Sequence, residues 1–215
     1  MPAQNPNFAE SEAQRVIVFM DEANVYHDAR RCFHADDEAA SSHMGRVWPP
    51  RYARELVGRQ PHGVTGDRVL EEVRVYTGMP SGKRDPKGYA AHRRQMAGWE
   101  AANVMVKARP LRYPPSWPKV SAMQKGVDVE IALDIVTMAI EGAYDVAILA
   151  STDTDLGPAL EAVNRVAEGP RIEVAAFRGG RQSKRLNVPG QHVWCHFVED
   201  DEYEKCRDYR NYNLA

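Results

Sequence analysis

The stretch from Asp145 to Val163, DVAILASTDTDLGPALEAV, constrains the fold more than any other part of the chain. Its apolar run, residues 146–150, is short and continuous, which predicts a buried strand. Polar residues end this run, and apolar side chains then recur at helical spacing. Asp153 and Asp155 therefore stand where a buried strand passes into a helix, the place at which open α/β sheets bind ligands.

Helix capping explains these two acids equally well when they are taken alone, because Asp accepts backbone N–H groups at a helix start. Two further acids favour a ligand site. RVIVFMDEANVY contains an apolar strand that ends at Asp21, with Asn24 three residues later, and KGVDVEIALDIVTMAI places Asp128 at the start of an amphipathic helix. Three segments thus bring acids to element ends, and clustered carboxylate oxygens suit Mg²⁺ or Mn²⁺.

These motifs resemble the NYN domains of the bacterial LabA-like type, relatives of the PIN-domain nucleases. The resemblance covers residues 15–198, and it includes Ser183-x-x-Leu186 before the last apolar strand. Thr152 stands where the family usually has glycine, and residues 35–67 form a longer segment than the family pattern predicts. The motifs that carry the resemblance are Asp21-x-x-Asn24, Lys125-Gly126-Val127-Asp128 and Ser151-x-Asp153-x-Asp155.

The resemblance implies a ribonuclease that depends on Mg²⁺ or Mn²⁺ and hydrolyses phosphodiester bonds. We expect Asp21, Asp128 and Asp153 to ligate the metal directly. Asp155 is the fourth catalytic acid, which acts on the metal through water or positions the attacking water. RNA as the substrate comes from the resemblance alone.

Four further residues are predicted to support this site. Asn24 would orient the first-strand acid or hold a phosphate oxygen, and Ser151 or Thr152 would hydrogen-bond a carboxylate. Lys125 precedes the helix that carries an acid, where its charge would neutralise the scissile phosphate.

Asp134 is a different kind of acid, because it shares an apolar stripe of the predicted helix 127–142. An acid in that position is unfavourable unless it is paired. It also lies about 9 Å along the helix from Asp128, too far to share one metal. We expect Asp134 to anchor the helix or to act through a neighbouring residue.

The most basic part of the chain is predicted to contact substrate phosphates. It begins in the turn after a strand at residues 69–77, continues along a helix to about residue 102, and resumes in the proline-rich segment 109–119. Solvated helix and loop surfaces are the alternative interpretation. The predicted phosphate-contacting residues are Lys83, Arg84, Arg93, Arg94, Arg109 and Arg112.

Strands and helices alternate along the chain, which predicts an α/β fold of three layers: a doubly wound, mostly parallel, PIN-like or Rossmann-like sheet of about five to six strands. We expect a flexible lead-in at 1–14, an NYN/PIN-like domain at 15–198 with an insertion at about 35–66, and a C-terminal tail at 199–215. A helix at 50–58 and a helical turn at 183–187 are expected within the domain.

The formal net charge of −2 excludes attraction of the whole molecule to nucleic acid, so any basic surface is local. Cys32, Cys195 and Cys206 have neither metal-ligand spacing nor a disulfide pattern, which favours a reducing cytoplasm. The N-terminus lacks the apolar region of a signal peptide, and no apolar run reaches membrane-spanning length, so no membrane association is expected. RNA is the expected partner, and a homo-oligomer or a protein partner stays open.

Two other functional classes remain. A non-cleaving RNA- or protein-binding NYN module is disfavoured by the retention of four acids. A metal-dependent phosphatase of small phosphoesters is compatible with the same acids, although Glu22 and Ala23 after Asp21 do not form the Asp-x-Asp of aspartyl phosphatases. No Ser/His/Asp or Cys/His arrangement, glycine-rich GxGxxG or P-loop motif is evident, which leaves metal-assisted hydrolysis as the expected reaction.

Overall fold

The computed structural model describes residues 12–35, 43–166, 169–179, 182–188 and 190–214. The helices of the described residues are α1 (Glu22–Phe33), α2 (Pro49–Val57), α3 (Pro86–Glu100), α4 (Val127–Ile140), the 3₁₀ helix η1 (Thr154–Leu156), α5 (Gly157–Val163) and α6 (Asp200–Cys206). The strands are β1 (Gln14–Asp21), β2 (Arg68–Met79), β3 (Val104–Pro110), β4 (Val146–Ala150), β5 (Arg171–Gly179), β6 (Gln182–Ser183) and β7 (Trp194–Val198).

The described strands form one sheet, in which β3, β2, β1, β4, β5 and β7 lie in this order and run parallel. The two-residue β6 pairs antiparallel with the end of β5. This arrangement confirms the predicted α/β fold with a mostly parallel sheet of about five to six strands. β1 and β4 are neighbours, with Met20 opposite Ala150, so their carboxyl ends lie side by side.

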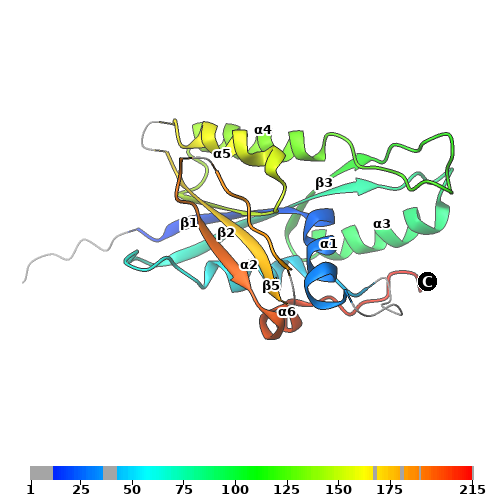
Figure 1. The fold of residues 1–215 in the computed structure, drawn as a ribbon, viewed down its shortest axis with the longest axis horizontal. Helices are drawn as coiled ribbons and strands as arrows, with labels where there is room; N and C mark the ends of the chain where they lie inside the picture. Colours follow the sequence, from blue (N-terminus) through cyan, green and yellow to red (C-terminus); the bar gives the residue numbers. More distant parts are fainter. Residues whose placement is uncertain (1–11, 36–42, 167–168, 180–181, 189, 215) are drawn as a thin grey trace, which may run out of the picture.

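Helices cover both faces of the sheet, as Figure 1 shows for α4 and α5 on one side and for α2 and α6 on the other. Alternate residues of β1 point to opposite faces: Val18 belongs to one apolar core, and Phe19 to the other. β4 is buried along its whole length, which explains its uninterrupted apolar sequence. No helix among the described residues is long and apolar enough to cross a membrane.

The predicted insertion contributes to the core where the structure describes it. α2 buries Tyr52 and Leu56 on one face, and both belong to the same core cluster as β1. Residues 36–42 of this segment, and residues 1–11 of the predicted lead-in, lie outside the described residues.

Two sequence-based expectations near the C-terminus are wrong. Residues 183–187 form no helical turn, since Ser183 ends β6 and an irregular segment follows. The C-terminal tail expected at 199–215 is instead attached to the domain where the structure describes it, because α6 buries Tyr203 completely, although Glu199, Asp200 and Asp201 at its start are exposed. An ion pair of 2.6 Å between Arg59 and Glu202 also attaches α6 to the rest of the domain. The acidic run starts α6, where negative charge favours the helix dipole.

A fully buried carboxylate links three strands on the face covered by α2 and α6. Glu173 of β5 has no exposed surface and binds Arg68 of β2 at 2.6 Å, Arg171 at 2.9 Å and His196 of β7 at 2.8 Å. Burial acts to raise the pKa of Glu173, but hydrogen bonds from His196 and Arg68 outweigh it and lower this pKa to about 2. The ionised carboxylate therefore stabilises the fold at neutral pH.

Substitution of this carboxylate should destabilise the fold strongly. We expect Glu173→Gln to lower the free energy of unfolding at pH 7 by about 3 kcal/mol, because it leaves the buried Arg68 without its partner charge. Urea unfolding measures this loss, with the exposed Glu71→Gln on β2 as control.

The pH dependence of this effect has a defined sign. The pKa of Glu173 in the folded state, about 2, lies below its ordinary value of 4.5, so its stabilisation is present above pH 4.5 and is lost as the pH falls toward 2. The difference in the free energy of unfolding between wild type and Glu173→Gln should become smaller as the pH falls through this range. Equal losses in the free energy of unfolding for Glu173→Gln and Glu71→Gln would contradict the account.

Candidate active site

Two acids end neighbouring strands at the carboxyl edge of the sheet. Asp21 is the last residue of β1 and the N-cap of α1, where its Oδ1 accepts a hydrogen bond of 3.1 Å from the backbone N–H of Asn24. Asp153 follows β4 and caps η1, where its Oδ1 accepts one of 3.0 Å from the backbone N–H of the exposed Asp155. Capping and ligand binding are compatible here, because each cap bond engages one of two carboxylate oxygens.

Asp21 is buried, with 7% of its surface exposed. Burial raises the pKa of Asp21 to about 6 from its ordinary value of 3.8, and the hydrogen bond from Asn24 partly offsets this increase. The negative charges of Glu22, Asp153 and Asp128 raise this pKa further. The structure therefore brings Asp21, Asp128 and Asp153 within electrostatic reach of one another.

The side chain of Asn24 joins the two strand ends. Its Oδ1 accepts hydrogen bonds from the backbone N–H and the hydroxyl of Thr152, at 2.9 and 3.2 Å. The buried Ser151 accepts a bond of 3.1 Å from the backbone N–H of Asp153. These hydroxyls thus hold the loop and Asn24, whereas the sequence analysis expected them to bond a carboxylate. Asn24 itself orients Asp21 through its backbone N–H.

The third acid, Asp128, lies in the first turn of α4. This helix begins after Gly126, whose φ of 77° is a left-handed conformation that favours glycine. Lys125 is exposed immediately before this turn. Arg109 lies beside Gly126 and pairs with Glu130 at 3.3 Å. Two of the cations predicted to contact phosphates therefore flank the helix start that carries Asp128.

Asp134 belongs to a separate polar group between α4 and the sheet. It accepts hydrogen bonds from Arg74 at 2.7 Å, Tyr76 at 2.6 Å and Lys107 at 2.9 Å. Burial acts to raise the pKa of Asp134, but the hydrogen bonds from Lys107 and Tyr76 and the nearby positive charges outweigh it and lower this pKa. These contacts give Asp134 the geometry of a helix anchor.

Three of the other predicted substrate-binding residues lie beyond the carboxyl ends of β2 and β3. Lys83 and Arg84 are exposed in the turn after β2, and Arg112 is exposed in the segment after β3. The guanidinium of Arg84 lies 5.5 Å from the centre of the Tyr113 ring. This contact joins the two basic segments, so these cations border the carboxyl edge on its β2–β3 side.

The remaining two cations are exposed on α3. Arg94 donates a hydrogen bond of 2.8 Å to the backbone carbonyl of Tyr212, and Arg93 precedes it in the helix. Arg94 therefore helps to hold the C-terminal segment.

A carboxylate that the sequence analysis passed over adds to the negative charge at Asp21. Glu22 accepts a hydrogen bond of 3.1 Å from the hydroxyl of Thr77, which lies 3.3 Å from Nε2 of His92 on α3. Burial lowers the pKa of His92, an effect that the charge of Glu22 opposes. The sequence signal that could have identified Glu22 is its position next to Asp21.

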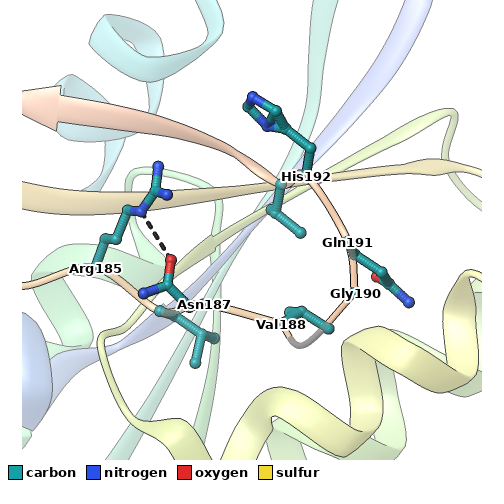
Figure 2. A pocket seen from close by; sticks show the side chains of 8 residues that line it. Arg185, Asn187, Val188, Gly190, Gln191 and His192 are labelled. Atoms are coloured by element: carbon teal, nitrogen blue, oxygen red, sulfur yellow. Dashed lines mark hydrogen bonds between the residues drawn. The ribbon is translucent and has the colours of Figure 1, made fainter.

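A pocket beside Asp153 contains cations that the sequence analysis did not select. One wall comes from the α1 and β4 ends, and the other from the irregular segment before β7. A second pocket adjoins it along this segment, and the two share Arg185 and Asn187 (Figure 2). The residues that line the first pocket are Asn24, Thr152, Asp153, Thr154, Lys184, Arg185, Asn187 and Phe197.

The acidic residues fit a hard divalent cation by donor chemistry. Among the described residues, no three Asp, Glu, His or Cys side chains converge closely enough to form a metal site by themselves. Asp21 nevertheless combines burial with three nearby negative charges, an arrangement that a divalent cation would relieve. Oxygen donors from three segments are the ligands that Mg²⁺ and Mn²⁺ prefer.

A doubly wound sheet with acids at its carboxyl edge is typical of a PIN-like domain, and the family comparison agrees. Residues 15–188 match the NYN domain family, so the chain belongs to this family of PIN-like nucleases. A crystal structure of a protein of unknown function, VPA0982 from Vibrio parahaemolyticus, is 18% identical, with a TM-score of 0.48 over 77% of this chain and 82% of that chain. No curated protein matches.

The raised pKa of Asp21 predicts how stability depends on pH without metal. Because its pKa in the folded state, about 6, exceeds its ordinary value of 3.8, ionisation should destabilise the fold as the pH rises from about 4 to above 6. Asp21→Asn keeps an N-capping side chain but cannot ionise. We expect this variant to be more stable than wild type by about 3 kcal/mol at pH 7.5 and equally stable near pH 4.

Urea unfolding in EDTA at several pH values measures this difference. The exposed Asp67→Asn is the control and should follow wild type at every pH. The electrostatic account fails if Asp21→Asn shows the same pH dependence as wild type.

Proposed function

We propose that this protein is a ribonuclease that hydrolyses phosphodiester bonds with the help of Mg²⁺ or Mn²⁺. The observation that carries this proposal is the buried Asp21, whose pKa is raised to about 6 by burial and by neighbouring carboxylates that include Asp153 and Asp128. Buried acids that repel one another are unfavourable for folding and suit a cation-dependent reaction. Membership of the NYN family supports nuclease chemistry and RNA as the substrate.

Each acid has a distinct role in this proposal. Asp21, Asp128 and Asp153 hold the cation, with water completing its coordination. Asp155 follows at the exposed side of η1, where it binds the cation through water or positions the attacking water. When bound, the cation supplies Lewis-acid activation of the phosphate and of water.

Neutral and basic residues position this chemistry. Asn24 holds Asp21 by its backbone N–H and the loop after β4 by its side chain, so the two acids keep their relative places. Lys125 and Arg109 flank the start of α4, where their charges can bind the phosphate that undergoes cleavage. Lys83, Arg84 and Arg112 extend the proposed substrate-binding surface beyond β2 and β3, and Arg93 and Arg94 extend it along α3.

The thiols of Cys32, Cys195 and Cys206 are buried, and a reducing cytoplasm is the proposed place of action. In the proposal, single-stranded or structured RNA is the partner. The same acids would also accept small phosphoesters, so the substrate test includes one.

Cleavage of a labelled RNA oligonucleotide tests the proposal directly. Wild type should cut the oligonucleotide with Mn²⁺ or Mg²⁺ and lose this activity in EDTA. We expect Asp153→Asn to reduce the rate by about 100-fold or more, because it weakens a cation that stabilises charge in the transition state.

Two controls separate the alternatives. Asp67→Asn, an exposed acid outside the site, should cut like wild type. Hydrolysis of p-nitrophenyl phosphate but not of RNA would favour a phosphatase, and RNA binding without cleavage would favour a binding module. RNA cleavage that is equal in wild type and Asp153→Asn would contradict the proposed site.

A further inference from the structure

The pocket beside Asp153 is lined by both positively and negatively charged side chains. Asp153 and Thr152 come from the end of β4, while Lys184 and Arg185 come from the segment between β6 and β7. These two cations are adjacent in sequence, and both are exposed. The pocket thus presents positive charge directly beside an acid of the proposed catalytic cluster.

The charge of these cations is available to a ligand. Within the described part of the chain, neither Lys184 nor Arg185 forms an ion pair with a carboxylate, not even with the Asp153 that shares their pocket. Arg185 uses Nε to donate a hydrogen bond of 2.8 Å to Oδ1 of Asn187, as Figure 2 shows. This bond fixes the guanidinium and leaves its two terminal nitrogens for an anion. A guanidinium held in this way suits bidentate binding of a phosphate.

The adjoining pocket continues from the same residues. It shares Arg185 and Asn187 with the first pocket and adds the polar side chains of Gln191 and His192 (Figure 2). The imidazole of His192 and the amide NH2 of Gln191, whose Oε1 accepts a hydrogen bond from Asn164, can bond the edges of unpaired bases, while buried Val188 and Val193 give the lining an apolar part. The two pockets therefore adjoin at Arg185 and Asn187, which is the arrangement that a phosphate followed by a nucleotide requires.

Two cations from the basic stretch selected by the sequence analysis are more strongly engaged. Arg109 pairs with Glu130, and Arg94 is bonded to the carbonyl of Tyr212. Arg178 of β5 lies near the first pocket, since its guanidinium is 3.7 Å from the centre of the Phe197 ring that lines it, and it pairs with Glu199 at 3.9 Å.

We infer that Lys184 and Arg185 form a phosphate-binding subsite for single-stranded RNA, next to the acidic cluster. The neighbouring nucleotide occupies the pocket that includes Gln191 and His192. This inference rests on the proposed ribonuclease function and deepens it. It assigns binding residues to the part of the RNA strand that extends from the cleavage site along the β5–β7 side of the sheet.

Anisotropy of a fluorescein-labelled single-stranded RNA of 12 nucleotides, measured in EDTA at 50 to 200 mM KCl, tests the subsite without cleavage. Lys184→Gln/Arg185→Gln should raise Kd about tenfold at 100 mM salt and reduce the slope of log K against log[salt] by about 1.4, or 0.7 for each lost phosphate contact. In cleavage with Mn²⁺, the same variant should raise KM more than it lowers kcat.

The matched control is Arg54→Gln/Lys205→Gln, which removes the same charge from exposed positions on α2 and α6. This control should stay within twofold of wild type in Kd. If wild type cuts RNA and the Lys184/Arg185 variant keeps its Kd and salt slope, the subsite is overturned and the proposed function stands. If wild type neither binds nor cuts RNA, both fail.

Discussion

The parallel pairing of β1 with β4 is the constraint on which the rest of the structure depends. It places Met20 opposite Ala150, so both chains leave the sheet at the same edge. The strands are buried on both faces, and any polar group at their ends must find partners or remain at the edge of solvent. Asp21 and the loop that begins at Ser151 occupy that edge, and the side chain of Asn24 fixes their spacing.

At this edge, burial and electrostatic repulsion act together against the ionised form of Asp21, an arrangement that suits the proposed catalysis. Burial favours the neutral form of Asp21, and three neighbouring carboxylates favour it further. Without a bound cation, Asp21 therefore holds its proton more tightly than a solvent-exposed aspartic acid does. Elsewhere in the sheet the opposite solution occurs: Glu173 is buried more completely, yet basic partners keep it ionised. The contrast between a paired and an unpaired buried acid supports our proposal that the functional site lies at the carboxyl edge.

The order of most elements, and the position of Asp21, Asp128 and Asp153 at element ends, could be predicted from sequence, because both depend on local patterns. The apolar run at 146–150 reports burial on both faces, and Asp21-x-x-Asn24 reports a strand end with a helix cap. Long-range contacts could not be predicted. The sequence around Glu202 does not indicate its ion pair with Arg59, so the sequence alone predicts a tail where α6 forms. The sequence does not indicate that Lys184 and Arg185 lie near Asp153, because only the fold brings these three residues to the lining of one pocket.

Binding of Mn²⁺, followed at pH 7.5 through the electron paramagnetic resonance signal of the free ion, tests the central claim that the acids at the carboxyl edge hold a divalent cation. Wild type and Asp67→Asn should bind the ion with equal affinity, whereas Asp21→Asn and Asp153→Asn should each weaken binding by about tenfold or more, since each removes a carboxylate that holds it. Equal affinity in all four proteins would contradict the account, because the ion would then bind elsewhere.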